Sequence, residues 1–284
     1  MIFRRLYAEK VAKFDVFTKE FREFIRDFNF WVQNGFQTKS IWVGPVMPSK
    51  KTSLYKIAGH LKLSIRQKNS KNHLLHIWFQ DQTKSASHPS ISDSDILNIH
   101  CTDISKKNVE KLHEKIWGYG MEIDPKTHQG KCVIKSDENA VHDGHIVQCP
   151  VADYDPTKVY QIVINNEDSG EFFDYRVAVM KQEVVIIYKK YKTPEKRFTN
   201  DTHRAEIASL EIIPSEIKNK IVLFCNEIQC DFCELDVLFD QDSQKWFVID
   251  INKTPYGPPA SLTALDKEKA VTQLSNGFQR NFLQ

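Results

Sequence analysis

The chain has 284 residues, of which 41% are hydrophobic and 27% are charged. This is enough for one large domain or two modest ones with a buried core. No apolar run approaches the roughly 18 residues that a membrane-spanning helix needs, and the N-terminal segment lacks the pattern of a secretory signal. Six cysteines are too few for a disulfide scaffold. We therefore expect a soluble, folded, cytoplasmic protein without a membrane span.

Positive charge is concentrated in the first part of the chain. The net charge is +2, but residues 1–80 contain 15 Lys or Arg and only 5 Asp or Glu, so the remainder is acidic. A basic segment of this kind favours an anionic partner, such as a phosphorylated small molecule, an acidic polymer or nucleic acid. A solvated basic face without a partner would give the same balance.

The N-terminal part has an α/β pattern. Aromatic residues at spacings of three and four predict an amphipathic helix over 11–33 that packs on the core or forms a dimer seam. These residues are Phe14, Phe17, Phe21, Phe24, Phe28 and Trp31. A strand over 41–46, a helix over 53–65 and a strand over 74–79 follow. The polar segment 80–95 predicts the boundary of a basic N-terminal domain covering residues 1–100.

The rest of the chain, residues 101–284, alternates helices with strands in hairpins. The predicted helices cover 105–117, 214–225 and 266–283. The predicted strands cover 132–135, 159–164, 176–180, 184–191, 235–239 and 246–251. Cys230 and Cys233 form a lone C-x-x-C pair, and no second pair completes a zinc site, so we expect structural thiols.

Three side chains that carry oxygen ligands gather in the last hairpin. Asp236 lies within one predicted strand, Asp250 ends the next, and Asn252 leaves the same face as Asp250 because side chains alternate along a strand. Two carboxylates and one amide oxygen suit Mg²⁺ that also binds phosphates. The alternative is an ordinary hairpin with solvated acids, although an acid buried in an apolar strand is costly.

Basic residues stand at strand ends and in loops of the middle segment. Lys135 ends a strand before the polar loop 136–144, and this arrangement is suited to binding phosphate. Three further cations, Arg176, Lys189 and Arg197, stand in or beside a later hairpin. The G-x-x-x-x-G-K-[ST] and G-x-G-x-x-G patterns are both absent from the sequence. For each of these cations taken alone, an ordinary surface residue is the default interpretation.

Taken in chain order, short motifs over about residues 101–260 resemble those of the ATP-grasp superfamily. The motifs are DISKK, CVIK, YQIVIN, DYRV, RFTND, LDVLFD and VIDINKTP, and longer runs are similar to those of a group of bacterial ATP-grasp proteins. The resemblance implies an α/β (α+β) chain: an N-terminal α/β domain, then an ATP-grasp fold of two α+β subdomains at about 101–170 and 171–284. ATP and Mg²⁺ would bind between the subdomains.

The resemblance also implies roles for individual residues. The implied nucleotide-binding residues are Lys106 (with Lys107 as a rival), Lys135, Asp143, Gln161, Ile162, Val163, Ile164 and Glu167. The implied catalytic cations are Arg176, Lys189 and Arg197, and the implied Mg²⁺ ligands are Asp236, Asp250 and Asn252. Ile162 stands in the adenine hinge where the superfamily often has glutamate.

The activity implied by the resemblance is that of a ligase. It would activate a carboxylate with ATP as an acylphosphate, join it to an amine and release ADP and phosphate. A kinase acting on a hydroxyl of an anionic sugar or polyol is the first alternative, because Asp-x-Asn also occurs in ATP-grasp inositol phosphate kinases. A nucleotide-binding protein without ligation is a further alternative. So is a polyanion- or nucleic-acid-binding module that uses residues 1–80.

We expect the acceptor to be an anionic small molecule, peptide or sugar, with nucleic acid disfavoured. The helix that contains Phe14 and Trp31 is the candidate seam for a homodimer.

Overall fold

The computed structural model describes residues 39–68, 72–86, 95–199 and 201–283, together with the single positions Ile25 and Val32. The predicted aromatic helix over 11–33, and the dimer seam with it, lies outside the described residues apart from those two positions. Within the described part of the chain, no helix is both long and apolar enough to cross a membrane.

The described strands form three sheets. A parallel sheet in the order β2-β1-β3-β4 contains β1 (Ser40–Pro45), β2 (Ser64–Arg66), β3 (His76–Phe79) and β4 (Ile96–Leu97). A small antiparallel sheet in the order β6-β5-β7 contains β5 (Gly130–Ser136), β6 (His145–Cys149) and β7 (Lys158–Ile162). A large antiparallel sheet in the order β11-β10-β9-β12-β13, with β8 on β9, contains β8 (Glu167–Asp168), β9 (Glu171–Met180), β10 (Glu183–Lys192), β11 (Arg204–Ala208), β12 (Phe232–Asp240) and β13 (Lys245–Asn252).

The described α-helices are α2 (Ser53–His60), α3 (Lys106–Trp117), α4 (Ser215–Glu227) and α5 (Ala264–Phe282), and two short 3-10 turns are η1 (Pro194–Lys196) and η2 (Leu210–Ile212). Helix α3 shows why such helices begin and end where the sequence predicts. The side chain of Ser105 accepts a hydrogen bond from the N–H of Asn108 at its start, and Gly118 ends it with a φ of +79°, a conformation that glycine adopts without strain.

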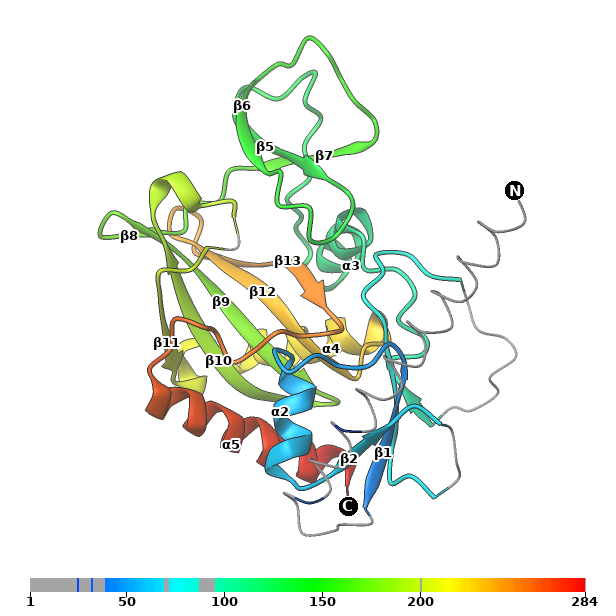
Figure 1. Cartoon of the computed structure of the whole chain (residues 1–284). Coiled ribbons are helices and arrows are strands. Elements are labelled where there is room, and N and C mark those ends of the chain that lie inside the picture. Colours follow the sequence, from blue (N-terminus) through cyan, green and yellow to red (C-terminus); the bar gives the residue numbers. More distant parts are fainter. Residues whose placement is uncertain are drawn as a thin grey trace, which may run out of the picture.

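One face of the large sheet packs on α3 and α4 (Figure 1). Alternate side chains such as Val177, Leu235 and Val248 enter this core, where Val109 of α3 and Phe224 of α4 meet them. Burial of an apolar side chain of this size contributes about 1.5–3 kcal/mol. This core therefore fixes the position of α3, whose first residue belongs to the site described below.

The opposite face of the large sheet is apolar over one half and polar over the other. The apolar half, which includes Ala178, Tyr188 and Phe232, is covered by α2, α5 and the parallel sheet (Figure 1). Helix α5 approaches β10 so closely that a Cβ at Gly277 would lie 2.5 Å from Val185. The N-terminal part thus shares a core with the large sheet, and the domain division near residue 100 stays a prediction.

The small sheet stands at one end of the molecule (Figure 1). It has an apolar cluster of its own, built around Cys132, Cys149 and Tyr160. Residues 163–166 lead from β7 to β8 and the large sheet. The small sheet therefore adjoins the main core through this short connection.

The predicted elements over the described part of the chain are present, but one helix is shorter than expected and some strands are new, among them the two-residue strands β4 and β8. The helix expected over 53–65 ends at His60, because Lys62 has a φ of +55°, and residues 64–66 form β2 instead. Strands β6 and β11 are absent from the sequence prediction. Both are edge strands with mostly exposed or half-buried residues, so they lack the apolar alternation that reveals a strand. All six cysteines are buried free thiols.

Candidate functional site

The polar half of the large sheet forms the floor of a cavity of about 1180 Å³. Its walls come from the turn before α2 and α2 itself, the loop after β5, the loop before β11, the segment after β13 and the start of α5. Segments far apart in the sequence therefore meet around one space. A cavity of this size can hold a nucleotide's phosphates together with a second substrate.

The register of the large sheet places charged side chains in a row across this floor. Arg176 of β9 lies directly opposite Asp236 of β12, and Asp236 lies directly opposite Asp250 of β13. Asn252 is likewise opposite Glu234. Directly opposed residues of an antiparallel pair share one face of the sheet. The strands themselves therefore bring together the three side chains that the sequence analysis assigned to Mg²⁺.

The carboxylate of Asp236 is held by two cations. Arg176 donates from Nε to Oδ1 at 3.0 Å and from Nη2 to Oδ2 at 3.1 Å, and the ammonium of Lys190 lies 3.1 Å from Oδ1. Burial alone would raise the pKa of Asp236, but the charges of Arg176 and Lys190 hold this pKa well below its usual range. Asp236 is therefore ionised at any physiological pH.

Asp250 differs from Asp236 in that its pKa is raised and not lowered. Burial, together with the nearby charge of Asp236, raises the pKa of Asp250 to about 6, although Lys106 and Lys135 act against the rise. Its Oδ1 accepts a hydrogen bond from the backbone N–H of Ile251 at 3.1 Å. A buried carboxylate that is this costly to ionise is a group that a bound cation would stabilise.

The donor set fits Mg²⁺ better than a transition metal. Two carboxylates and the amide oxygen of Asn252, which here accepts a hydrogen bond from the N–H of Thr254 at 2.9 Å, are hard oxygen ligands. Among the described residues, no three His, Cys, Asp or Glu side chains are grouped to hold a metal. A Mg²⁺ ion at Asp236, Asp250 and Asn252 would therefore need substrate phosphates or water as further ligands.

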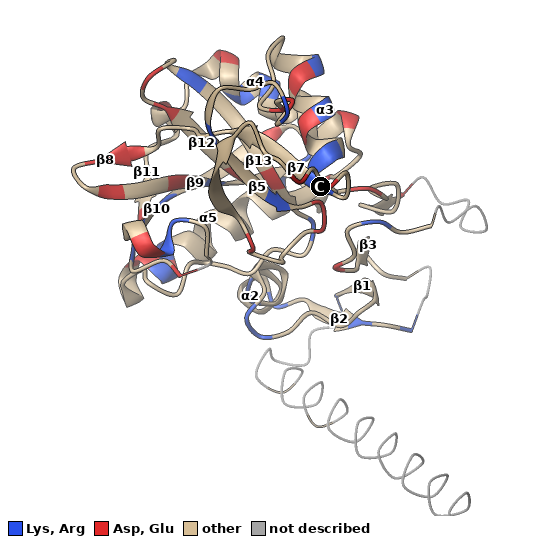
Figure 2. Cartoon of the chain, turned by 90° about the horizontal axis from the view of Figure 1, so that it is seen from above, with Lys and Arg blue, Asp and Glu red and all other residues tan. Residues whose placement is uncertain are grey.

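Two lysines act on Asp250 from other elements. Lys135 of β5 is partly buried, and this burial lowers its pKa to about 8, although Asp250 opposes the change. In Figure 2, blue (Lys and Arg) and red (Asp and Glu) segments of the ribbon occur around the labels of β5 and β13. The ammonium of Lys106, the first residue of α3, donates to the carbonyl of Glu138 at 2.5 Å. Its rival Lys107 is exposed and donates to the carbonyl of Pro156, so Lys106 is the lysine near Asp250.

The loop after β5 is tied to its surroundings. The N–H of Asn139 donates to the hydroxyl of Thr83, and its side-chain amide lies 3.4 Å from the carbonyl of Ile251. Asp143 closes the base of the loop by accepting hydrogen bonds from Ser136 and from Lys158 at 2.9 Å. The structure thus occupies both oxygens of Asp143 within the small sheet, and Asp143 is not among the residues that line the cavity.

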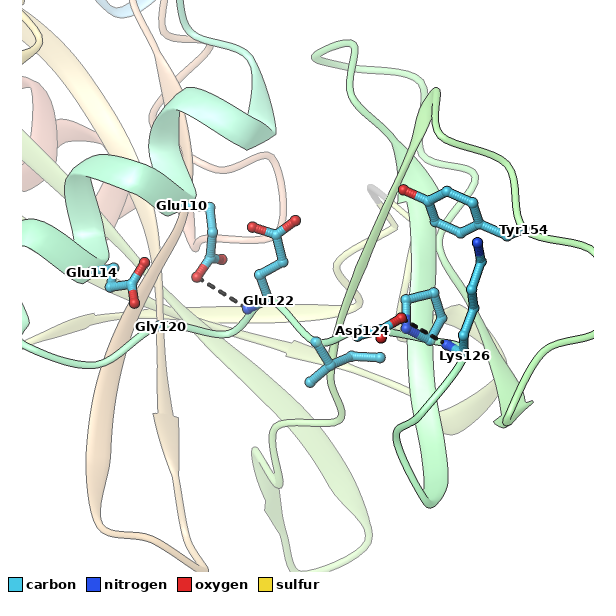
Figure 3. Close-up of a pocket in the computed structure, with 9 residues that line it drawn as sticks. Glu110, Glu114, Gly120, Glu122, Asp124, Lys126 and Tyr154 are labelled. Carbon is cyan, nitrogen blue, oxygen red and sulfur yellow. Dashed lines mark hydrogen bonds between the residues drawn. The ribbon is translucent and has the colours of Figure 1, made fainter.

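The predicted adenine hinge follows β7. The N–H of Ile162 donates to the carbonyl of Met121, and the side chain of Gln161 donates to Glu110 of α3 at 2.5 Å. Glu110 also accepts from the N–H of Glu122, at the edge of an acidic pocket behind the hinge that Figure 3 shows. The Gln161 side chain is therefore committed to α3, and its backbone is paired with Val133 of β5 on one side and with Glu122 on the other.

An apolar wall adjoins the hinge. Ile162 and Ile164 belong to one cluster with Leu238 of β12 and Ile249 of β13, and Ile249 immediately precedes Asp250. Val163 is half-buried, and Glu167 is exposed on β8 beyond the hinge. The wall offers an apolar surface next to the charged floor, as a flat aromatic base attached to a triphosphate requires.

Two of the predicted catalytic cations, Lys189 and Arg197, do not line the cavity, and their catalytic roles stay predictions. Lys189 points to the face opposite the cavity, where its ammonium lies 4.2 Å from the centre of the Phe173 ring. Arg197 donates to the carbonyl of Ile164 at 2.5 Å and to Asn166 at 3.0 Å, so it braces the hinge. Lys190 lines the cavity and Lys189 does not, because adjacent residues of a strand point to opposite faces.

The sequence analysis missed two residues of the cavity floor. Lys190, the neighbour of Lys189, is 5% exposed and bonds both Asp236 and Asp174. Glu234 is 2% exposed and lines the cavity. Glu234 lies two residues before Asp236 in the same strand, so period-two alternation could have found it. Nothing in the sequence distinguishes Lys190 from Lys189.

No protein-family model matches the sequence, and no curated protein matches it. Solved structures do match. VanG D-Ala:D-Ser ligase from Enterococcus faecalis superposes with a TM-score of 0.56 at 11% identity, covering 87% of this chain and 100% of that one. D-alanine–D-alanine ligase from Bacillus anthracis, complexed with ATP, gives 0.53 at 14% identity, covering 87% and 98%. The ATP-grasp ligase PsnB, complexed with a minimal precursor, gives 0.52 at 11% identity, covering 77% and 91%.

These matches define the class of fold. The chain has the α+β fold of the ATP-grasp ligases, and the resemblance predicted from the sequence is confirmed at the level of fold. At such low identities the likeness concerns architecture alone.

Proposed function

We propose that the protein is a Mg-ATP-dependent ligase that activates a carboxylate as an acylphosphate and joins it to an amine. One observation carries the proposal. Asp236, Asp250 and Asn252 share one face of the sheet, and the charges of Lys106 and Lys135 act on the same carboxylate, Asp250. This arrangement of acids and lysines lies in a fold shared with ligases, one of which is complexed with Mg and ADP in its structure.

The chain's own residues would divide the binding of ATP between them. Ile162, Leu238 and Ile249 would pack against the adenine, and the hinge backbone would hydrogen-bond its edge. Lys106 and Lys135 would bind phosphate oxygens. Asp236, Asp250 and Asn252 would hold Mg²⁺, which when bound supplies positive charge that stabilises the transferring phosphoryl group.

The proposed reaction has two steps. An oxygen of the substrate carboxylate bonds to the γ-phosphorus as the bond to ADP breaks, and ADP leaves with that electron pair. The amine nitrogen then bonds to the acyl carbon as phosphate leaves and takes up the proton that the amine loses. Arg176, fixed by Asp236, is placed to hold the donor carboxylate at the cavity floor, which is an orienting role.

Nucleotide binding provides the first test. The melting temperature of the wild type should rise with Mg-ATP or Mg-ADP, because a ligand that binds only the native state stabilises it. Lys106→Met should abolish the rise, and Lys107→Met, the matched control at the exposed neighbour, should retain it. If neither nucleotide shifts the wild type, the proposal is wrong.

A screen of carboxylate and amine pairs provides the second test. A ligase releases ADP and free phosphate only when both substrates are present. A kinase releases ADP and keeps the phosphoryl group on its product. ADP release without free phosphate would therefore replace the ligase with the kinase alternative.

A further inference from the structure

A buried carboxylate at the cavity floor has an oxygen that the protein leaves without a hydrogen bond. The side chain of Glu234 is 1% exposed. Its Oε1 accepts a hydrogen bond from the hydroxyl of Ser53 at 3.2 Å, but its Oε2 has no hydrogen-bond partner among the described residues. The nearest cation, Nε of Arg176, lies 3.8 Å from Oε2. Burying an oxygen without a hydrogen bond costs free energy unless a ligand donates the missing hydrogen bond.

The surroundings hold this carboxylate in place. A Cβ at Gly257 would lie 2.8 Å from the Ser53 hydroxyl and 3.1 Å from Oε1 of Glu234, so the chain passes close to both. The hydroxyl of Ser261, another residue lining the cavity, is also buried without a partner among the described residues. Two residues that line the cavity, Glu234 and Ser261, thus each contain a buried polar atom without a partner among the described residues.

The outer walls of the same cavity carry an excess of positive charge. Lys50, Lys51 and Lys56 line it from the turn before α2 and from α2 itself, and Lys267 lines it from α5, against two acids of these walls, Asp81 and Asp201. Within the described residues, none of these four ammonium groups forms an ion pair. Burial and the nearby charge of Lys267 lower the pKa of Lys56, whereas Glu234 acts in the opposite direction. Like charges that crowd one wall in this way favour an anion between them.

The two features together define a ligand with opposite charges at its two ends. We propose, on the basis of the ligase function proposed above, that the acceptor is an acidic amino acid or short acidic peptide. Its ammonium group binds at Glu234 and its carboxylates bind at Lys51, Lys56 and Lys267. The ammonium of Lys56 donates to the carbonyl of Gly257 at 2.6 Å, and a Cβ at Gly257 would lie 3.1 Å from Oε1 of Glu234, so the two ends are close enough for one small molecule to span.

Three dipeptide probes separate the two ends of the ligand. L-Glu-L-Glu has the ammonium and the acidic side chains, its N-acetyl form lacks the ammonium, and L-Gln-L-Gln lacks the acidic side chains. Isothermal titration calorimetry would be run on the full chain with Mg²⁺ and a non-hydrolysable ATP analogue. We expect the wild type to bind L-Glu-L-Glu about tenfold or more tightly than either other probe, because each loses a hydrogen-bonded charge pair.

Two variants assign the preferences to residues. Glu234→Gln should abolish the preference for the free amine and keep the preference for acidic side chains. Lys267→Met should do the reverse. Lys111→Met, a change at an exposed lysine of α3 away from the cavity, should leave both preferences unchanged.

The inference is overturned if L-Glu-L-Glu does not bind, if the wild type does not discriminate among the probes, or if both preferences survive in the variants. The comparison of probes on the wild type needs no variant, so it remains decisive even if Glu234→Gln unfolds. The Mg-ATP thermal shift is measured separately. A shift without dipeptide binding rejects this inference and leaves the ligase proposal intact, whereas no shift rejects the ligase proposal.

Discussion

Asp236 and Asp250 face each other on neighbouring strands, yet their pKa values are displaced in opposite directions. Arg176 and Lys190 contact Asp236 directly and lower its pKa, whereas burial and the charge of Asp236 raise the pKa of Asp250 to about 6. One floor of a single cavity therefore holds a permanent anion beside an acid that titrates close to neutrality.

Asp250→Asn should stabilise the protein at neutral pH while removing the Mg-nucleotide site. The pKa of Asp250 in the folded state, about 6, exceeds the value near 4 of an unfolded aspartate. Ionisation therefore disfavours the folded state, and stability is lost as the pH rises through 6. The variant should gain about 2–3 kcal/mol at pH 7.5 and little at pH 4.

Urea unfolding at these two pH values, with Asp153→Asn as the control at an exposed aspartate, measures the gain. A variant that is less stable at pH 7.5, or equally stabilised at both pH values, contradicts the prediction. The Mg-ATP thermal shift should be absent from the variant although its melting temperature is higher.

The affinity for ADP should fall as the pH rises from 7 to 9. Burial lowers the pKa of Lys135 to about 8, so its ammonium loses its proton across this range and its attraction for phosphate is lost. Titration calorimetry at pH 7 and 9 should show a decrease of up to about tenfold in the wild type. Lys135→Met should bind weakly at both pH values. An affinity of the wild type that does not change with pH would remove Lys135 from the phosphate site.

Lys189 and Lys190 form a matched pair of neighbours on opposite faces of β10. Lys190→Met leaves Asp174 and Asp236 short of a cation in a buried setting, so it should cost about 3 kcal/mol of unfolding free energy. Lys189→Met removes a contact with an aromatic ring and should cost about 1 kcal/mol or less. Urea unfolding of both variants tests the assignment of faces, and equal costs would argue against it.

Arg176 and Asp236 should behave as one unit. Arg176→Met leaves the half-buried carboxylate of Asp236 without its bidentate partner and the buried carboxylate of Glu234 without its nearby cation, and it should cost about 3–5 kcal/mol. The double variant Arg176→Met/Asp236→Asn should cost less than the two single changes added together, by about 1–3 kcal/mol.

The pH dependence of this coupling follows from the direction in which folding shifts the pKa of Asp236. The pKa of Asp236 is lowered in the folded state, so the stabilisation is present above pH 4 and is lost as the pH falls further. A double-mutant cycle at pH 7.5 and pH 3.5 checks both statements, and additive costs at pH 7.5 would show that the two residues act independently.

The sequence was sufficient to predict the last hairpin and the grouping of Asp236, Asp250 and Asn252, because polar residues interrupt strands that otherwise alternate clearly. Lys189 shows where such reasoning fails. Both faces of β10 are apolar before the lysines, with Ile187 in one core and Tyr188 in the other, so alternation does not show which lysine enters the cavity.

Packing between segments that are distant in the chain also could not be predicted from the sequence. Lys253 follows Asn252 directly and has the composition of a surface residue, yet it is 1% exposed and donates to the carbonyl of Cys101 at 3.0 Å. The basic segment 1–80 suggested an anionic partner, but only the fold brings Lys51 and Lys56 into the same cavity as Glu234.

The separate apolar cluster of the small sheet has a consequence for how the cavity opens. Cys132, Cys149 and Tyr160 are buried within the small sheet, so a rotation of this sheet away from the cavity would leave their packing intact. If Ile162 and Ile164 keep their apolar contacts at the hinge during this rotation, the contacts that must break are polar, such as the one from Lys106 to the carbonyl of Glu138 and the one from Asn139 to Ile251. Opening that exposes little apolar surface has a small change in heat capacity, whereas contacts to a lysine are weakened by salt. Ionic strength, more than temperature, would therefore control how readily substrates enter.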